Sequence, residues 1–67
     1  MKILKLRGKM VEKGMNVEAL ASAMNIDRAT LYRKLNDGEK FTIGDAKKIR
    51  AALDLIDEEA IDIFFGH

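Results

Sequence analysis

Arginines and short polar side chains recur over residues 28–36 at spacings that would group them on one face of a helix. At about 100° per residue, Arg33, Ala29 and Asn36 lie opposite the two leucines of the segment, which point inward. Arginine donates two hydrogen bonds to guanine O6 and N7, asparagine pairs with adenine, and small apolar groups contact the thymine methyl. The pattern therefore predicts a helix that reads bases in the major groove of DNA.

The candidate base contacts on this helix are Arg28, Ala29, Thr30 and Arg33. Tyr32 lies about 100° from the buried direction, so its ring can cover the edge of the core while its hydroxyl reaches a phosphate. The sequence leaves phosphate contact and edge packing open for Tyr32. For the whole segment, the alternative is a surface helix with solvated charges, and the turn that precedes the helix argues against it.

A tight turn between two short helices is specified within residues 16–36. Asn16 is a good N-cap, because its side-chain oxygen can accept hydrogen bonds from the free amides of the first turn. Asn25 stands where the chain must reverse with a positive φ, which asparagine adopts more readily than most residues. Asp27 is placed to cap the second helix. Residues 16–36 therefore predict a helix-turn-helix, whose second helix enters the major groove.

The segment LAxxMNIDRATLYRKL, residues 20–35, resembles the helix-turn-helix core of the phage repressor class, also called the XRE or Cro/C1-type family. The resemblance covers nearly the whole chain and implies one all-α domain over residues 1–67, with the lambda-repressor-like fold of five short helices. It implies a transcriptional regulator, a Cro-type or prophage repressor, that binds a palindromic operator in double-stranded DNA. The resemblance also implies a homodimer, since many relatives of this class dimerise weakly or only on DNA.

The same resemblance, together with the outward positions on the second helix, predicts which residues contact the DNA phosphates. The residues concerned are Asn16, Val17, Glu18, Tyr32, Asn36, Lys40 and Thr42. Three positions depart from the family pattern. Asn25 replaces the usual glycine of the turn, and Asp27 replaces a capping Ser or Thr and brings a negative charge near the expected DNA. Val17 stands where the family often has glutamine, so only the backbone amides of residues 17 and 18 remain for that phosphate.

Length and composition fit one small domain. A chain of 67 residues lies near the lower limit for an independent hydrophobic core. It has no cysteine, so neither a disulfide nor a thiolate metal site stabilises it. No segment reads as a signal peptide or a transmembrane span. We therefore expect a protein of the bacterial cytoplasm or nucleoid with no membrane partner.

The net charge of +1 hides an asymmetry along the chain. Residues 1–50 carry all 12 Lys and Arg residues against 6 acids, a net of +6, whereas residues 51–67 carry 5 acids and no base, a net of −5. The basic portion is expected to face phosphates and the acidic portion to point away from DNA, with chance clustering as the plainer alternative. The first predicted helix, residues 2–13, contributes a basic edge for a phosphate backbone, made of Lys2, Lys5, Lys9 and Lys13.

The remaining elements follow from caps and apolar spacing. Gly14 is expected to end the first helix, and Gly38 to take a positive φ in the loop after the second helix of the turn. The capping-box pattern T-x-x-D, Thr42–Asp45, starts a helix near Ile43 that runs to about Asp54. Phe41 is expected to anchor the core, and Asp57 to cap the last helix. Predicted inward residues are Ile3, Leu4, Leu6, Met10 and Val11 in the first helix and Ile43, Ala46, Ile49 and Leu53 in the fourth.

The C-terminal segment carries more apolar residues than one face of a short helix can bury. They are Ile61, Ile63, Phe64 and Phe65. At least one is expected to be exposed, and such exposure often marks an interface. We predict a homodimer interface at Ile61, Phe64 and Phe65, which would place two recognition helices about 34 Å apart. The alternative is that both Phe rings fold back against the first helix.

Catalysis finds little support, so we expect no enzyme, no cofactor and no small-molecule substrate. His67 is the only histidine and the last residue, and no HExxH or P-loop motif occurs. The acids Asp57, Glu58, Glu59 and Asp62 suit a helix N-terminus and do not match an EF-hand, so no metal site is expected.

Two other function classes remain open. One is a protein-binding regulator, an antirepressor or antitoxin, that acts through its acidic, Phe-bearing last helix. The other is a nonspecific architectural DNA binder, which would bind all duplexes alike.

Overall fold

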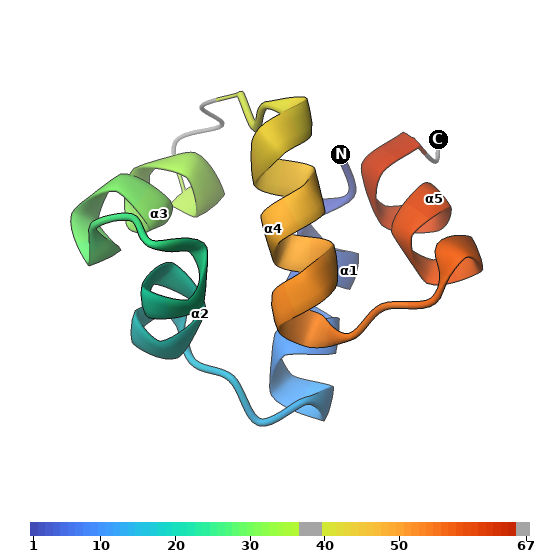
Figure 1. Cartoon of the computed structure of the whole chain (residues 1–67), viewed down its shortest axis with the longest axis horizontal. Coiled ribbons are helices and arrows are strands. Elements are labelled where there is room, and N and C mark those ends of the chain that lie inside the picture. The colour runs from blue at the N-terminus through green and yellow to red at the C-terminus, as the bar shows by residue number, and fades with distance from the viewer. Residues whose placement is uncertain (37–39, 66–67) are drawn as a thin grey trace.

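The computed structural model describes residues 1–36 and 40–65, and over these ranges the chain forms five helices and no strand. In chain order the helices are α1 (Ile3–Glu12), α2 (Val17–Met24), α3 (Arg28–Asn36), α4 (Ile43–Leu53) and α5 (Asp57–Phe65) (Figure 1). The predicted all-α architecture is confirmed. The expectation for Gly38 lies outside the described residues.

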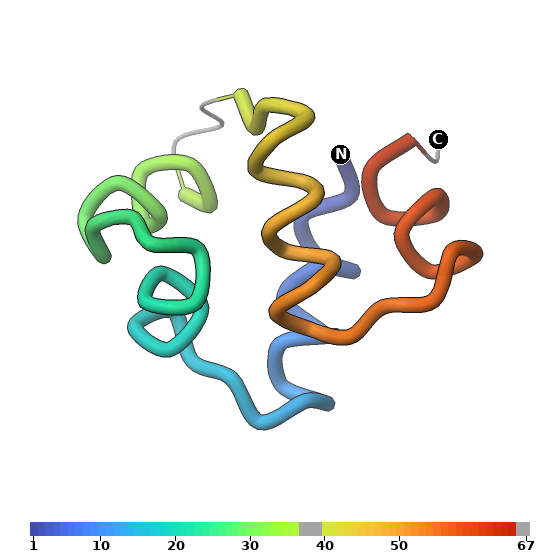
Figure 2. Tube along the Cα trace, viewed as in Figure 1, coloured from blue at the N-terminus to red at the C-terminus, as the bar shows by residue number. Residues whose placement is uncertain are grey.

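α4 runs through the centre of the molecule, with α2 and α3 on one side and α5 on the other (Figure 1). α1 lies behind α4 in this view, and the backbone trace follows the same course (Figure 2). α2 packs against both α3 and α4, and α1 packs against α5. The helix-turn-helix and the C-terminal helix therefore occupy opposite sides of the protein.

The predicted caps at the two ends of α2 are present. The Asn16 side chain accepts a hydrogen bond from the Ala19 N–H at 2.7 Å. Asn25 has φ 58° and ψ 44°, the left-handed conformation that ends α2. Gly14, just after α1, has φ 71°. These residues set the directions of the chain into and out of α2, and hence the angle at which α3 follows.

Side-chain caps also mark the N-terminal ends of α4 and α5. The Thr42 hydroxyl accepts from the Asp45 N–H at 3.0 Å, and the Asp45 carboxylate accepts from the Thr42 N–H at 2.9 Å. The predicted capping box is thus confirmed. The predicted cap of α5 is wrong by one position: Asp57 is its first helical residue, and the Glu59 carboxylate accepts from the N–H of the preceding Ile56 at 3.1 Å.

Every helix contributes to one hydrophobic core. Its fully buried large side chains are Leu6, Leu20, Met24, Leu31, Ile49, Leu53 and Ile63. Phe41 is half-buried and packs against this core, as predicted. The core thus joins the two helices of the turn to α1, α4 and α5.

Three predicted core residues are exposed instead: Leu4 at 84%, Val11 at 81% and Ile43 at 74%. The inward stripe of α1 passes through Leu6 and Met10, and Leu4 and Val11, seven residues apart, share a face outside it. In α4 the buried positions are four apart and include Asp45, which turns Ile43 outward. Apolar residues alone did not identify the inward face, because a polar residue occupies part of it.

Candidate nucleic-acid interface

The two helices of the turn bury one side and leave the other open. Leu20, Ala21 and Met24 of α2 are buried, and so are Leu31 and Leu35 of α3. All five belong to the common core. The opposite side of α3 is consequently held at a defined angle and open to solvent.

The predicted base contacts lie on α3, where Arg28, Ala29 and Arg33 are exposed and Thr30 is half-buried. Arg33 Nη2 donates to the Thr30 hydroxyl at 3.4 Å. Arg28 is 62% exposed, and its Nη1 lies 4.0 Å from a carboxylate oxygen of Glu18 on α2. The structure thus brings Arg33 and Thr30 together one turn apart, with Arg28 at the N-terminal end of the same helix.

The predicted backbone contacts surround α3. Val17 is half-buried, and the exposed ones are Asn16, Glu18, Tyr32, Asn36, Lys40 and Thr42. Asn16 already uses its side-chain oxygen as a cap, so its amide nitrogen is the group left to donate to a phosphate. Tyr32 is 44% exposed, an intermediate position compatible with both roles that the sequence left open.

Arg7 of α1 is a residue that the sequence reasoning missed. Its Nη2 donates to the Asn36 side-chain oxygen at 2.5 Å, across 29 positions of sequence. The contact ties the last residue of α3 to α1 and orients an amide group that was predicted to contact DNA. No local pattern signals such a pair, because both residues belong to separate helices whose approach only the fold determines.

Lys34 and Asp45 were also missed as positioning residues. Lys34 Nζ lies 3.0 Å from the Asp45 carboxylate and donates to the Lys40 carbonyl at 3.0 Å. The same ammonium lies 5.6 Å from the centroid of the Phe41 ring, within cation–π range. The contacts join α3, the segment that carries Lys40, and α4, so they fix the backbone at Lys40 and Thr42 relative to α3.

Asp45 is the one buried charged residue in the described part of the chain. Burial raises the pKa of its carboxyl, but the hydrogen bond from the Thr42 N–H and the adjacent Lys34 ammonium outweigh burial and lower the pKa below its ordinary value. The carboxylate is therefore ionised at neutral pH. It acts within the protein, as a cap and an ion-pair partner.

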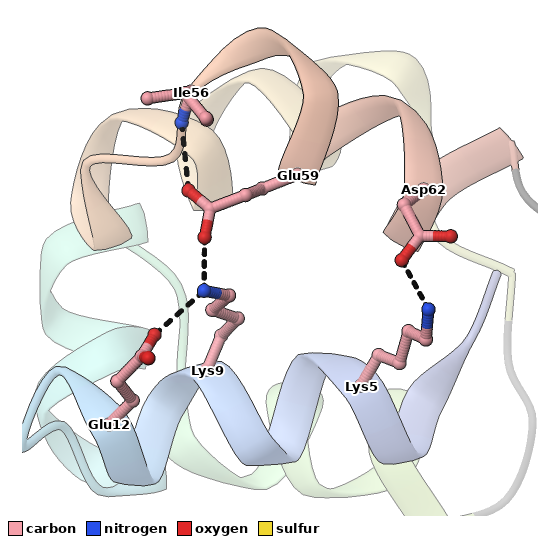
Figure 3. Close-up of polar contacts among 6 residues, drawn as sticks. All are labelled: Lys5, Lys9, Glu12, Ile56, Glu59 and Asp62. Atoms are coloured by element: carbon pink, nitrogen blue, oxygen red, sulfur yellow. Dashed lines mark hydrogen bonds and ion pairs between the residues drawn. The ribbon is translucent and has the colours of Figure 1, made fainter.

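Three of the four lysines predicted to form a basic edge on the first helix are held in ion pairs, whereas Lys13 is exposed and makes no ion pair within the described residues. Lys2 Nζ lies 3.0 Å from the Asp62 carboxylate. Lys5 also donates to Asp62, and Lys9 pairs with Glu59 (Figure 3). The Lys5 ammonium lowers the pKa of Asp62, and the Lys9 ammonium lowers the pKa of Glu59.

The charge asymmetry along the sequence is therefore largely neutralised in space. Two acids of α5, Glu59 and Asp62, lie against lysines of α1, because the two helices pack together. The expectation of separate basic and acidic surfaces is wrong for α1 and α5. The positive charge of the helix-turn-helix side comes instead from α3 and the segment after it, from Arg28, Arg33 and Lys40.

No group of His, Cys, Asp and Glu side chains within residues 1–36 and 40–65 could hold a metal ion. None of the helices in those ranges is long and apolar enough to cross a membrane. Besides the Glu18 carboxylate, the candidate interface presents cations, amides and hydroxyls, which are donors for phosphates and base edges.

Comparison with known protein families matches residues 4–38 to the helix-turn-helix domain of resolvase. The chain belongs to this family. The match takes in α1, α2 and α3, the three helices that carry the predicted DNA contacts, and leaves α4 and α5 outside it. The protein therefore contains a helix-turn-helix DNA-binding domain. The curated proteins and the solved structures gave no significant match.

Proposed function

We propose that the protein is a sequence-specific regulator of transcription, a Cro-type repressor that reads a palindromic operator with α3. The observation that carries the proposal is the open face of α3, where Arg28, Ala29 and Arg33 are exposed in a helix held by the core. Arginine on a major-groove helix selects guanine, and the adjacent Thr30 and Ala29 suit other base edges. We further propose that it acts in the cytoplasm by binding alone, without catalysis or a cofactor.

The family match and the resemblance support different parts of this proposal. A helix-turn-helix of the resolvase type supports binding to DNA through α3. The regulatory role rests on the resemblance to phage repressors, which extends beyond residue 38 and implies five helices. The helix order found here is compatible with that fold.

In this proposal, contacts to the phosphate backbone of the DNA supply affinity. Lys40, Thr42 and Asn36 adjoin the C-terminal end of α3, and the amides of Val17 and Glu18 lie at the N-terminal end of α2. A helix N-terminus with free amides favours an anion. Contacts of this kind position the protein on the duplex and make its affinity depend on salt, but they carry no sequence information.

A homodimer through α5 completes the proposal. Ile61 is 59% exposed and Phe65 is 70% exposed, which agrees with the prediction that not all apolar residues of this helix can be buried. Phe64 is half-buried against the core, so the alternative in which both Phe rings fold inward fails for Phe65. Because α5 lies opposite the helix-turn-helix, pairing through α5 would leave both copies of α3 at outer positions (Figure 1). One copy measures 28 × 22 × 19 Å, which suits half-sites about 34 Å apart.

Selection from a random duplex library, followed by titration at two salt concentrations, tests the proposal. We expect an enriched palindrome that binds far more tightly than random DNA. Arg33→Ala should cost about 1–3 kcal/mol at one base pair and relax the choice there. Lys40→Ala should weaken all sequences alike and reduce the salt slope by about 1. Lys5→Ala is the matched control, because the Lys5 ammonium donates to Asp62 of α5, away from the helix-turn-helix.

The other outcomes assign the other classes. Salt-sensitive binding without enrichment, with equal losses for Arg33→Ala on all duplexes, would indicate an architectural DNA binder. Absence of binding would favour the protein-binding alternative, an antirepressor or antitoxin that uses the exposed Ile61 and Phe65.

A further inference from the structure

An apolar groove lies between α4 and α5, on the side of the molecule away from α2. It has a volume of about 690 Å³. Four exposed large hydrophobic side chains line it: Met1, Ile43, Ile61 and Phe65. Half-buried Phe41 and Phe64 also contribute to its lining. Exposed apolar groups gathered in this way, and not scattered singly, mark a binding surface.

The charges along the groove are mostly basic, and its one acid, Asp57, is paired with Arg50. Lys34 and Arg50 line it but are occupied, Lys34 by Asp45 and Arg50 by Asp57. Lys40 and Lys47 line it as well, and neither makes an ion pair within the described part of the chain. The ammonium groups of Lys40 and Lys47 thus flank an apolar channel without an ion-pair partner among the described residues.

A second copy of this chain complements those ammonium groups poorly. Three of the four acids of α5 are already paired inside the protein: Asp57 with Arg50, Glu59 with Lys9 and Asp62 with Lys2 and Lys5. A two-fold pair would also present the same lysines from both copies to one interface. A different molecule that brings both apolar side chains and free carboxylates fits the groove better.

We propose that the groove binds an acidic amphipathic helix of another protein. Apolar side chains of that helix, at spacings i, i+3, i+4 and i+7, would fill the channel between Ile43 and Phe65. Glu or Asp residues beside the apolar stripe would meet Lys40 and Lys47. An 11-residue helix such as α4 is about 16 Å long, so a partner helix of about three turns can run along it.

Such a partner would regulate assembly. Ile61 and Phe65 line the groove and are also the proposed dimer contacts, so a helix seated there excludes the second copy. Lys40 is shared with the proposed phosphate contacts, so a carboxylate bound to it competes with DNA as well. The binding of the helix itself does not depend on the proposed function and is measured without DNA.

The test is selection from a display library of amphipathic helices on the intact protein. The apolar stripe of the library varies among Leu, Ile, Met and Phe, and the flanking positions vary among Glu, Gln and Lys. We expect enriched helices with Glu at the flanks. Ile43→Gln/Ile61→Gln should abolish their binding, and both residues are exposed, so the fold should persist, as circular dichroism can verify.

A pair of charge-reversal variants measures the electrostatic contribution to binding of the acidic helix. Lys47→Glu should weaken the acidic helices about fivefold, as expected for an exposed ion pair that is reversed. Lys48→Glu makes the same change on the same helix at an exposed residue outside the groove, and should leave binding nearly unchanged.

Four results would overturn the proposal. They are enrichment of Lys-flanked helices, enrichment of none, binding that survives Ile43→Gln/Ile61→Gln, and equal effects of the two Lys→Glu changes. If no helix is enriched and the chain self-associates through Ile43 and Ile61, the groove belongs to a second copy. If no helix is enriched and Lys47→Glu weakens duplex binding, Lys47 belongs to the DNA interface.

Discussion

Replacing Asp45 by Asn removes one negative charge from the junction of α3 and α4 while nearly preserving the shape of the side chain. The carboxylate accepts hydrogen bonds from the Thr42 N–H at 2.9 Å and from Lys34 at 3.0 Å. Both side chains of the Lys34–Asp45 pair are largely buried, at 16% and 12% exposed. Their interaction is therefore screened by water much less than a surface ion pair.

The size of the expected loss of stability follows from the two hydrogen bonds that the Asp45 carboxylate accepts. A hydrogen bond to a charged group contributes about 1.5–3 kcal/mol and a neutral one about 0.5–1.5 kcal/mol. The Asp45→Asn change would convert both bonds to weaker ones, while a neutral amide is less costly to bury than a carboxylate. We expect the free energy of unfolding to fall by about 1–2 kcal/mol. For a chain of this size the melting temperature should fall by about 5–15 °C.

The pH dependence provides a second readout of the same group. The pKa of Asp45 is lowered in the folded protein, so its contribution to stability is present above the ordinary pKa of 3.8 and is lost as the pH falls through the folded-state value. Asp45→Asn lacks this contribution at every pH. The stability gap between the two proteins should be full at about pH 7 and should shrink toward about pH 2.5.

Urea unfolding followed by circular dichroism, at both pH values, measures the gap. Glu58→Gln is the control, since Glu58 is an exposed carboxylate that makes no ion pair within the described residues. A double-mutant cycle with Lys34→Met separates the Lys34–Asp45 energy from that of the cap. A loss below about 0.3 kcal/mol at neutral pH, or an equal gap at both pH values, would refute the role assigned to Asp45.

Two further perturbations test the turn and the packing of α1 against α5. Asn25→Ala should lower the free energy of unfolding in urea by about 1–2 kcal/mol, because alanine is strained at φ 58°. Asn25→Gly should be nearly neutral. Equal effects of the two changes would show that the left-handed turn is not required. Asp62→Asn should lower the melting temperature at neutral pH. The difference from the unchanged protein should shrink below pH 3.8, because the Lys5 ammonium lowers the pKa of Asp62 in the folded protein. It should also shrink in about 1 M salt, because the Lys5–Asp62 pair is exposed. A difference that ignores both acid and salt would mean that Asp62 acts through packing and not through charge.

The sequence alone predicted the features that depend on neighbours along the chain. The caps by Asn16 and Thr42 and the left-handed turn at Asn25 each involve groups within a few residues, so local sequence is enough to predict them. The inward leucines and the open side of α3 follow from helical periodicity for the same reason. These local rules were sufficient for the all-α fold and for the helix-turn-helix.

Tertiary structure decided what depends on distant residues. It turned Ile43 outward, and it joined Arg7 to Asn36 across 29 positions and Lys34 to Asp45 across 11. It also placed Glu59 and Asp62 of α5 on lysines of α1, so that charges counted on two separate segments form ion pairs between the helices. The net charge of each segment can be counted from its residues, but ion pairing falls off within a few ångströms, so only the packing of the helices determines which charges remain for a partner.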